Sequence, residues 1–326
     1  MATKILTDIS STAWEHPADR AALNALRAIP GFDAAIRKIA GFIGDRPLRQ
    51  LFLGSAVRVG LTQRPRLDAM LTDVLATLDW PERPELYVTQ SPVMNAAAVG
   101  FDKPFIVLNS SLLEHLAEDE QRAVIAHEVG HVMSGHVLYR TIALIVIYFG
   151  VTALPVLAAA ALLPFQVALL EWYRKSEFSA DRAGLLGVQN RDTAMLLQMK
   201  LAGGPEHGHA IDLDAFMAQA MEYETKGDAW DRVVQMLNTV MRDHPFATVR
   251  AGELQRWIDG GGYDRILAGE YARRADVRER GPDIEKDVSD AASYYGAKAR
   301  EAAHHVSDVI ARARDAFEDA FRGAAR

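Results

Sequence analysis

The feature that most constrains this chain is the pentapeptide His-Glu-Val-Gly-His at residues 127–131, which lies within an otherwise apolar run. Two histidines four residues apart share one face of an α-helix, so His127 and His131 can bind the same metal ion. Glu128, between them, can then contact a water molecule bound to that metal. Burying two imidazoles and a carboxylate without partners would be costly. The sequence therefore predicts a buried helix with a metal site, and the alternative is a pair of ordinary core histidines.

Composition excludes several classes of protein. The chain has 326 residues, 49% of them hydrophobic and 24% charged, which is typical of a globular protein with a substantial core. A formal net charge of -7 argues against nucleic acid as a partner. The absence of cysteine excludes disulfides, thiolate ligands and a cysteine nucleophile. The N-terminal sequence does not resemble a signal peptide, so we expect a protein of the cytoplasm or of the cytoplasmic face of a membrane, not a secreted one.

Two histidines need a third ligand, and the residues after the motif narrow the choice. The metzincin pattern would place Gly and His where this chain has Ser134 and Val137, so that class is excluded. His136 would point to the opposite side of a continuing helix, and we interpret it as structural. Glu177 and Asp181 share a helix face, so one can bind the metal while the other accepts a hydrogen bond from a ligand histidine. This pattern predicts a His-His-Glu site with one position left for water; an exposed acidic pair is the alternative.

The segment 141–170, between the histidines and these acids, contains no charged residue. A membrane span needs about 20 residues, so the segment is too short to cross a membrane twice. A single crossing would place the histidines and the acids on opposite sides of the membrane. We therefore predict an apolar helical hairpin broken near Gly150 or Pro155, either embedded in a membrane or buried in the protein. Aromatic and basic residues at its two ends, Tyr139-Arg140 and Trp172 to Lys175, are typical of membrane-interface anchors and favour membrane contact.

The remaining patterns predict an α+β fold that is mainly helical. The run 118–120 is acidic, as expected for the first turn of the metal-site helix. An amphipathic helix is expected over 67–78, followed by short strands at 85–89 and 105–109, so a small β-sheet lies next to that helix. Further helices are predicted over 213–225 and 228–242.

Three segments are expected along the chain: a helical segment 1–45, a main domain 46–258 that includes the hairpin, and a helical extension 259–326. The run Gly260 to Gly262 marks the end of the main domain. Apolar residues recur at steps of four and three from Tyr295 to Ala320, which predicts a helix with one apolar seam. That seam either packs on its own domain, which is the simpler interpretation, or mediates self-association.

Taken in order, these motifs resemble the HtpX-like and CAAX prenyl endopeptidase family of gluzincin metallopeptidases. The family pattern is Asn-Ala on a strand with a nearby Gly, then HExxH, an apolar segment, Glu-x-x-x-Asp, and His-Pro with a downstream Arg. In this chain the first and last parts of the pattern are Asn95-Ala96 with Gly100, and His244-Pro245 with Arg250. The resemblance covers roughly residues 45–255. The chain lacks the apolar N-terminal spans of the family's integral membrane members.

The resemblance implies a zincin-like fold and one Zn²⁺ per chain, with metal ligands His127, His131 and Glu177. It implies that Glu128 is the general base. Asp181 would accept a hydrogen bond from a ligand histidine. In the gluzincin mechanism these residues hydrolyse peptide bonds, so protein or peptide substrates are expected.

The resemblance also implies how substrate is held. Asn95 and Ala96 would lie on the edge strand that receives the substrate backbone, and His244 and Arg250 would stabilise the oxyanion. The role it implies is a zinc-dependent endopeptidase in the quality control of membrane-associated proteins. The alternative is a non-catalytic zinc-binding scaffold for membrane proteins.

Overall fold

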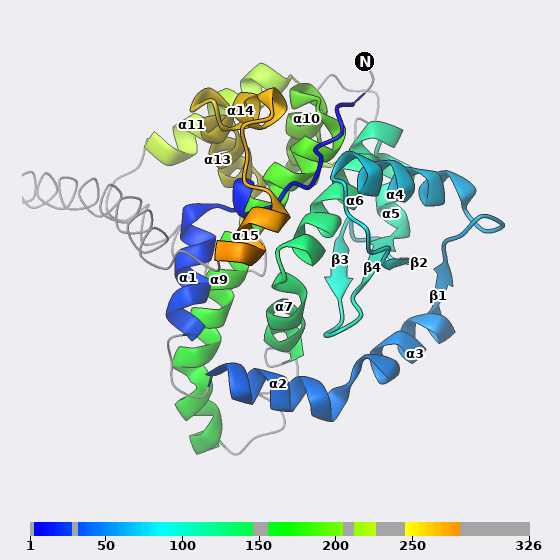
Figure 1. Ribbon diagram of the computed structural model, residues 1–326, viewed down its shortest axis with the longest axis vertical. Coiled ribbons are helices and arrows are strands. Elements are labelled where there is room, and N and C mark those ends of the chain that lie inside the picture. Colours follow the sequence, from blue (N-terminus) through cyan, green and yellow to red (C-terminus); the bar gives the residue numbers. More distant parts are fainter. Residues whose placement is uncertain (1–2, 28–31, 146–155, 205–211, 226–244, 281–326) are drawn as a thin grey trace, which may run out of the picture.

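The computed structural model of the protein describes residues 3–27, 32–145, 156–204, 212–225 and 245–280 (Figure 1). In these residues the fold is mainly helical with one small sheet, which confirms the predicted α+β class. The strands are β1 Ala56–Arg58, β2 Glu85–Thr89, β3 Ala96–Val99 and β4 Phe105–Asn109. The helices are the 3-10 helix η1 Ser11–Ala13, α1 Pro17–Arg27, α2 Phe32–Ile43, α3 Asp45–Ser55, α4 Pro65–Thr77, α5 Ser110–His115, α6 Glu118–Met133, α7 His136–Ile145, α9 Val156–Val188, α10 Arg191–Gly203, α11 Leu213–Thr225, α13 Ala247–Asp259, α14 Gly262–Ala268 and α15 Arg274–Arg280.

Several predicted elements are confirmed, and others lie outside the described residues. The helices expected over 67–78 and 213–225 are α4 and α11, and α6 begins at the acidic run as predicted. The predicted break of the hairpin, the helix over 228–242 and the seam from Tyr295 to Ala320 all concern residues outside the described ranges. Self-association through that seam stays a prediction.

The described strands form one sheet in the order β1-β2-β4-β3. β2 and β4 are the two predicted strands; they run parallel, with Glu85 opposite Phe105 and Thr89 opposite Asn109. β1 and β3 flank them in the antiparallel direction. β3 therefore occupies one edge of the sheet, where it packs against α6 and α7.

The two faces of the sheet are covered by different helices because successive side chains of a strand point to opposite faces. Leu86 and Ile106 lie in the main hydrophobic core together with α4 and α6. Tyr87 and Phe105, on the other face, pack against Phe52 of α3. The sheet is thus held between α3 on one side and the metal-site helix on the other.

Residues before and after the predicted main domain contribute to its core. Near the N-terminus, Leu6, Ile9 and Trp14 are fully buried in the main hydrophobic cluster, and α1 packs along α9. After the main domain, Tyr263 and Ile266 of α14 are buried in the same cluster. The division into three segments stays a prediction, and the packing is continuous across both of its boundaries.

The ends of the uncharged segment 141–170 are packed inside the protein. Ile142 and Ala143 of α7 and Leu169 of α9 form a second hydrophobic cluster with residues of α1 and α2. Figure 1 shows α2 running across the lower end of α7, and the two helices are in contact. None of the helices in the described part of the chain combines the length and the apolar composition that crossing a bilayer requires.

The flanking aromatic and basic residues, apart from the half-buried Lys175, are buried, so the prediction that they are membrane-interface anchors is wrong for them. Arg140, Trp172 and Tyr173 are each at most 2% exposed, and Arg174 is also buried. Trp172 packs edge-on against Tyr139. These side chains have the composition of anchors, but α7 and α9 pack them against neighbouring helices and remove them from any surface.

Helices α6 and α9 cross with almost no side chain between them. Gly130 of α6 faces Ala183 of α9, and Gly187 of α9 faces Ala126 of α6. A methyl group at either glycine would overlap the facing alanine. The backbones can therefore approach closely, and residues on the facing sides of the two helices come within bonding reach of one metal.

We expect Gly187→Ala to lower the free energy of unfolding by about 1–3 kcal/mol, because the added methyl group forces a close-packed contact apart. Chemical denaturation of the metal-free protein measures this loss. Gly203→Ala, at the end of α10, is the matched control because its new methyl group meets open space, and it should be neutral or slightly stabilising. Equal stability of Gly187→Ala and the unchanged protein would contradict the close crossing.

Candidate metal centre

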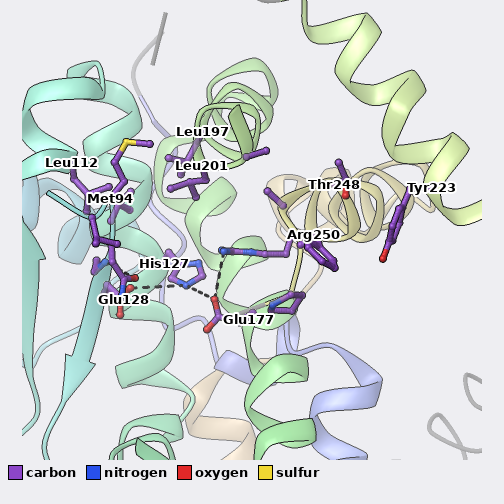
Figure 2. A pocket seen from close by; sticks show the side chains of 18 of the residues that line it. Met94, Leu112, His127, Glu128, Glu177, Leu197, Leu201, Tyr223, Thr248 and Arg250 are labelled. Carbon is purple, nitrogen blue, oxygen red and sulfur yellow. Dashed lines mark hydrogen bonds and ion pairs between the residues drawn. The ribbon is translucent and has the colours of Figure 1, made fainter. Parts of the chain in front are cut away.

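Three candidate ligands converge where α6 meets α9, and Figure 2 shows two of them, His127 and Glu177, facing each other. The ligand atoms of His127, His131 and Glu177 lie within 4.8 Å of one another. His127 Nε2 is 3.6 Å from Glu177 Oε2, and His131 Nε2 is 3.3 Å from Glu177 Oε1. All three residues are buried. The structure thus brings together the residues that the sequence predicts as ligands.

The donor set and its spacing fit a zinc ion. Tetrahedral zinc with bonds of about 2.0–2.1 Å separates its ligand atoms by about 3.3–3.4 Å. The two histidine–glutamate separations, 3.3 Å and 3.6 Å, are close to that value, and all three ligand atoms lie within 4.8 Å of one another. Two imidazoles and one carboxylate form the donor set of catalytic zinc sites, which keep a fourth position open.

Asp181 contacts the ring nitrogen of His127 that faces away from the ligand cluster. Its Oδ1 is 3.2 Å from His127 Nδ1, and a carboxylate in this position orients the ring and leaves Nε2 available to a metal. Arg250 of α13 donates to both oxygens of Asp181, from Nε at 2.8 Å and from Nη2 at 2.5 Å. Gln198 donates a further hydrogen bond at 3.0 Å. Asp181 is therefore held from two sides.

The prediction that His136 points away from the site is wrong. Helix α6 ends at Met133, and Gly135, with a φ of 66°, turns the chain before α7 begins at His136. The turn brings His136 Nδ1 to 3.1 Å from His131 Nδ1. On its other side, His136 Nε2 is 3.0 Å from Oδ2 of Asp19, a residue of α1.

Arg140 is a second site residue that sequence reasoning places elsewhere. Its Nη1 lies 2.6 Å from His131 Nε2 and contacts Glu177 Oε1. Its Nη2 donates to the hydroxyl of Tyr173 at 2.8 Å. The guanidinium therefore uses two of the acceptor atoms that a metal would use, and the two cations compete for them. The sequence offered one indication that Arg140 belongs to the site, namely its position only nine residues after His131.

The two ligand histidines differ in charge. Burial lowers the pKa of His131 well below its usual value, and the neighbouring Arg140 cation lowers it further. Burial also opposes the charged form of His127, but hydrogen bonds with Asp181 and Glu177 outweigh it and raise the pKa of His127 to about 9. Near neutral pH the metal-free site therefore holds His127 as an imidazolium, protonated on both ring nitrogens, and His131 as a neutral imidazole.

Glu128 lies beside the ligands and is held by the edge of the sheet. Its Oε1 is 4.0 Å from His127 Nε2. Its Oε2 accepts a hydrogen bond of 2.7 Å from the backbone N–H of Ala98 in β3. The carboxylate is thus fixed in orientation, with one oxygen bound to the strand and the other directed to the ligand cluster.

A cavity of about 680 Å³ adjoins the ligands. Three further predicted site residues, Asn95, Ala96 and Arg250, line it together with Glu128. Its remaining wall is mostly apolar, as Figure 2 shows, and includes Met94, Leu112, Val124, Leu197 and Leu201. His244, the other predicted oxyanion residue, lies outside the described residues, and the adjacent Pro245 lines the cavity.

A zincin-like helix pair with a His-His-Glu group and a glutamate between the histidines defines a metallopeptidase of the HExxH class. Residues 61–258 match the model of peptidase family M48, and the chain belongs to this family. The predicted HtpX-like metallopeptidase family is thereby confirmed, and the chain is a metalloprotease.

The similar proteins agree with this assignment. The plastoglobule-localized metallopeptidase 48 of the chloroplast of Arabidopsis thaliana is 32% identical over 269 residues, which cover 81% of this chain and 77% of that protein. A protease HtpX homolog of Helicobacter pylori is 30% identical over 159 residues, 41% of this chain and 51% of the homolog. The chain thus spans about half the length of that homolog. No solved structure matches the chain.

Binding of a divalent metal near neutral pH should release about one proton, because His127 must lose its proton before Nε2 can act as a ligand. The apparent affinity should therefore rise about tenfold per pH unit until the pH reaches the pKa of His127, about 9, and then level off. Calorimetric titration with zinc in two buffers of different ionisation enthalpy measures the proton count.

The control for this proton release is Asp181→Asn. It removes a negative charge that raises the pKa of His127, so fewer protons should leave at the same pH. If the unchanged protein binds zinc without releasing a proton between pH 7 and 8, the assigned charge of the two histidines is wrong.

Proposed function

We propose that this metalloprotease is a zinc-dependent endopeptidase that cleaves protein substrates. The observation that carries the proposal is the buried group of His127, His131 and Glu177 with the carboxylate of Glu128 next to it. The donor set is that of catalytic zinc sites in peptidases. A cavity of about 680 Å³ beside these residues has room for several substrate side chains.

Glu128 is proposed as the general base. A bound zinc ion would polarise the scissile carbonyl and lower the pKa of water at the site. Glu128 would accept a proton from the attacking water and return it to the leaving amine. The hydrogen bond from Ala98 N–H supports this role, because it holds the carboxylate in one orientation while the second oxygen stays available to the proton.

The substrate backbone is proposed to pair with the outer edge of β3 near Asn95 and Ala96. Ala96 and Asn95 line the cavity at that edge, and backbone pairing with an edge strand fixes the register of a peptide. Arg250, with two nitrogens bound to Asp181 and its Nη1 3.6 Å from Glu177 Oε2, lies on the opposite wall. We propose that its Nη1, together with His244, donates to the carbonyl oxygen as negative charge develops there.

Glu128→Gln should lower kcat/KM for casein by about 100- to 10,000-fold, because the amide cannot accept the proton of water. Zinc content, measured by elemental analysis, should stay at one ion per chain, since Glu128 is not a ligand. Cleavage is followed by gel electrophoresis and by mass spectrometry of the fragments.

Glu118→Gln is the matched control for Glu128→Gln. Glu118 is an exposed acid at the start of the same helix, and its amide variant should cleave casein at the unchanged rate. Zinc-loaded protein that cleaves no unfolded protein, before or after Glu128→Gln, would support the non-catalytic zinc-binding scaffold in place of the endopeptidase.

We further propose that the protein acts at the cytoplasmic face of a membrane, on damaged or membrane-associated proteins. The uncharged, apolar composition of residues 146–168, between the two buried ends of this segment, supports membrane contact. A second support is Phe42 at the end of α2, which is 92% exposed and lies near exposed Arg37 and Lys38. An exposed aromatic residue beside basic residues is suited to an anionic lipid surface.

The protein should therefore sediment with vesicles that contain anionic lipid. Phe42→Asp should reduce the fraction of protein bound to the vesicles several-fold, because it adds a negative charge to an apolar contact. Leu61→Asp is the matched control: Leu61 is 85% exposed but lies in the loop between β1 and α4. Protein that stays in the supernatant with anionic vesicles would contradict membrane contact.

A further inference from the structure

A buried carboxylate from the N-terminal helix α1 is connected to the metal centre. Asp19 is 1% exposed and lies outside the segment 61–258 that matches the family model. Its Oδ1 accepts a hydrogen bond from Trp172 Nε1 at 2.9 Å, and its Oδ2 accepts one from the hydroxyl of Ser179 at 2.5 Å. The same Oδ2 is 3.0 Å from His136 Nε2. Asp19 is thus surrounded by donors.

The hydrogen bonds between Asp19 and the ligand His131 have one consistent direction. Arg140 can only donate, so His131 Nε2, 2.6 Å from its Nη1, is an acceptor without a proton. The proton of a neutral His131 is then on Nδ1, and His136 Nδ1 at 3.1 Å accepts it. His136 therefore carries its own proton on Nε2, which donates to the carboxylate of Asp19.

We propose that Asp19 and His136 are positioning residues that hold the ligand His131 through a hydrogen-bond relay, so that its Nε2 lone pair faces the metal. This inference rests on the metal centre of the proposed function. The relay matches the contact on the other ligand, where Asp181 holds His127 directly. Each ligand histidine is then oriented by a buried carboxylate, one from α9 and one from the N-terminal segment.

The packing of the helices explains why His136 lies between Asp19 and His131. Asp19 bonds to Ser179 and Trp172 of α9, so its position is set by the packing of α1 on that helix. The turn at Gly135 places His136 between this carboxylate and His131. A ring with one nitrogen on each side can join the two, and it transmits the preference for a tautomer because each nitrogen must take the opposite role.

Asp19→Asn tests the relay with little change in volume. The amide has one oxygen where the carboxylate had two, so an NH₂ group must face either Trp172 or His136. Facing His136, it would reverse both tautomers and put a proton on His131 Nε2. Loss of such a supporting contact weakens metal binding by about 10- to 100-fold. We expect this increase in the zinc dissociation constant, measured by competition with a chromophoric chelator at fixed pH.

Glu253→Gln is the matched control. Glu253 is also a buried acid that contacts the N-terminal segment, with its Oε2 3.4 Å from His16 Nε2, and its Oε1 lies 3.0 Å from Nη2 of Arg256. Its zinc dissociation constant should stay within about twofold of the unchanged protein. His136→Leu should weaken zinc binding as much as Asp19→Asn, and the double variant should be no weaker than either single one, because both residues act through one relay.

A spectroscopic measurement on the unchanged, zinc-loaded protein tests the relay without any variant. Nitrogen NMR of labelled histidine should find the proton of His131 on Nδ1 and that of His136 on Nε2. The opposite tautomer of His136 would overturn the proposal, as would a folded His136→Leu protein that binds zinc as tightly as the unchanged one. If the unchanged protein binds no zinc, the proposed function fails as well, so the two failures are distinguishable.

Discussion

The metal centre depends on how closely α6 approaches α9. Its two histidines are on one helix and its glutamate is on the other, and a zinc ion bridges only about 3.3–3.4 Å between ligand atoms. The approach is achieved with glycine and alanine, as at Gly130 facing Ala183 and Gly187 facing Ala126. Larger side chains at these positions would separate the helices and move Glu177 out of reach. The sheet contacts α6 through β3, and the N-terminal helix α1 contacts α9, so both pack against this pair of helices.

Buried charge is the second constraint. Glu177, Asp181 and Asp19 are almost completely buried, and an ionised carboxylate in such a place requires partners. Arg250 supplies two hydrogen bonds to Asp181, and Arg140 contacts Glu177. The site therefore holds its acids by neighbouring cations and hydrogen bonds before any metal binds. A bound metal ion would add a positive charge, which the carboxylate of Glu177 and two neutral imidazoles would coordinate.

The sequence predicts those parts of the site whose geometry is local. His127 and His131 lie within one turn of one helix, as do Glu177 and Asp181, so residue spacing alone places each pair on a shared face. The strands 85–89 and 105–109 are equally local, because short β-branched and aromatic runs between loops favour extended backbone. The same local reasoning misjudged His136 and Arg140. It assumed a continuing helix and a membrane surface, whereas Gly135 turns the chain and α7 packs inward.

By itself, the sequence of this protein determined the metal-binding chemistry: two histidines, their intervening glutamate and a second acidic pair, in an order typical of one peptidase family. Only the tertiary structure decided which groups support that chemistry. Asp19 reaches His131 through His136, and Arg250 reaches Asp181 from α13. Contacts between residues so distant along the chain leave no periodic signal in it, since they arise when helices pack and bury polar groups that must then find partners.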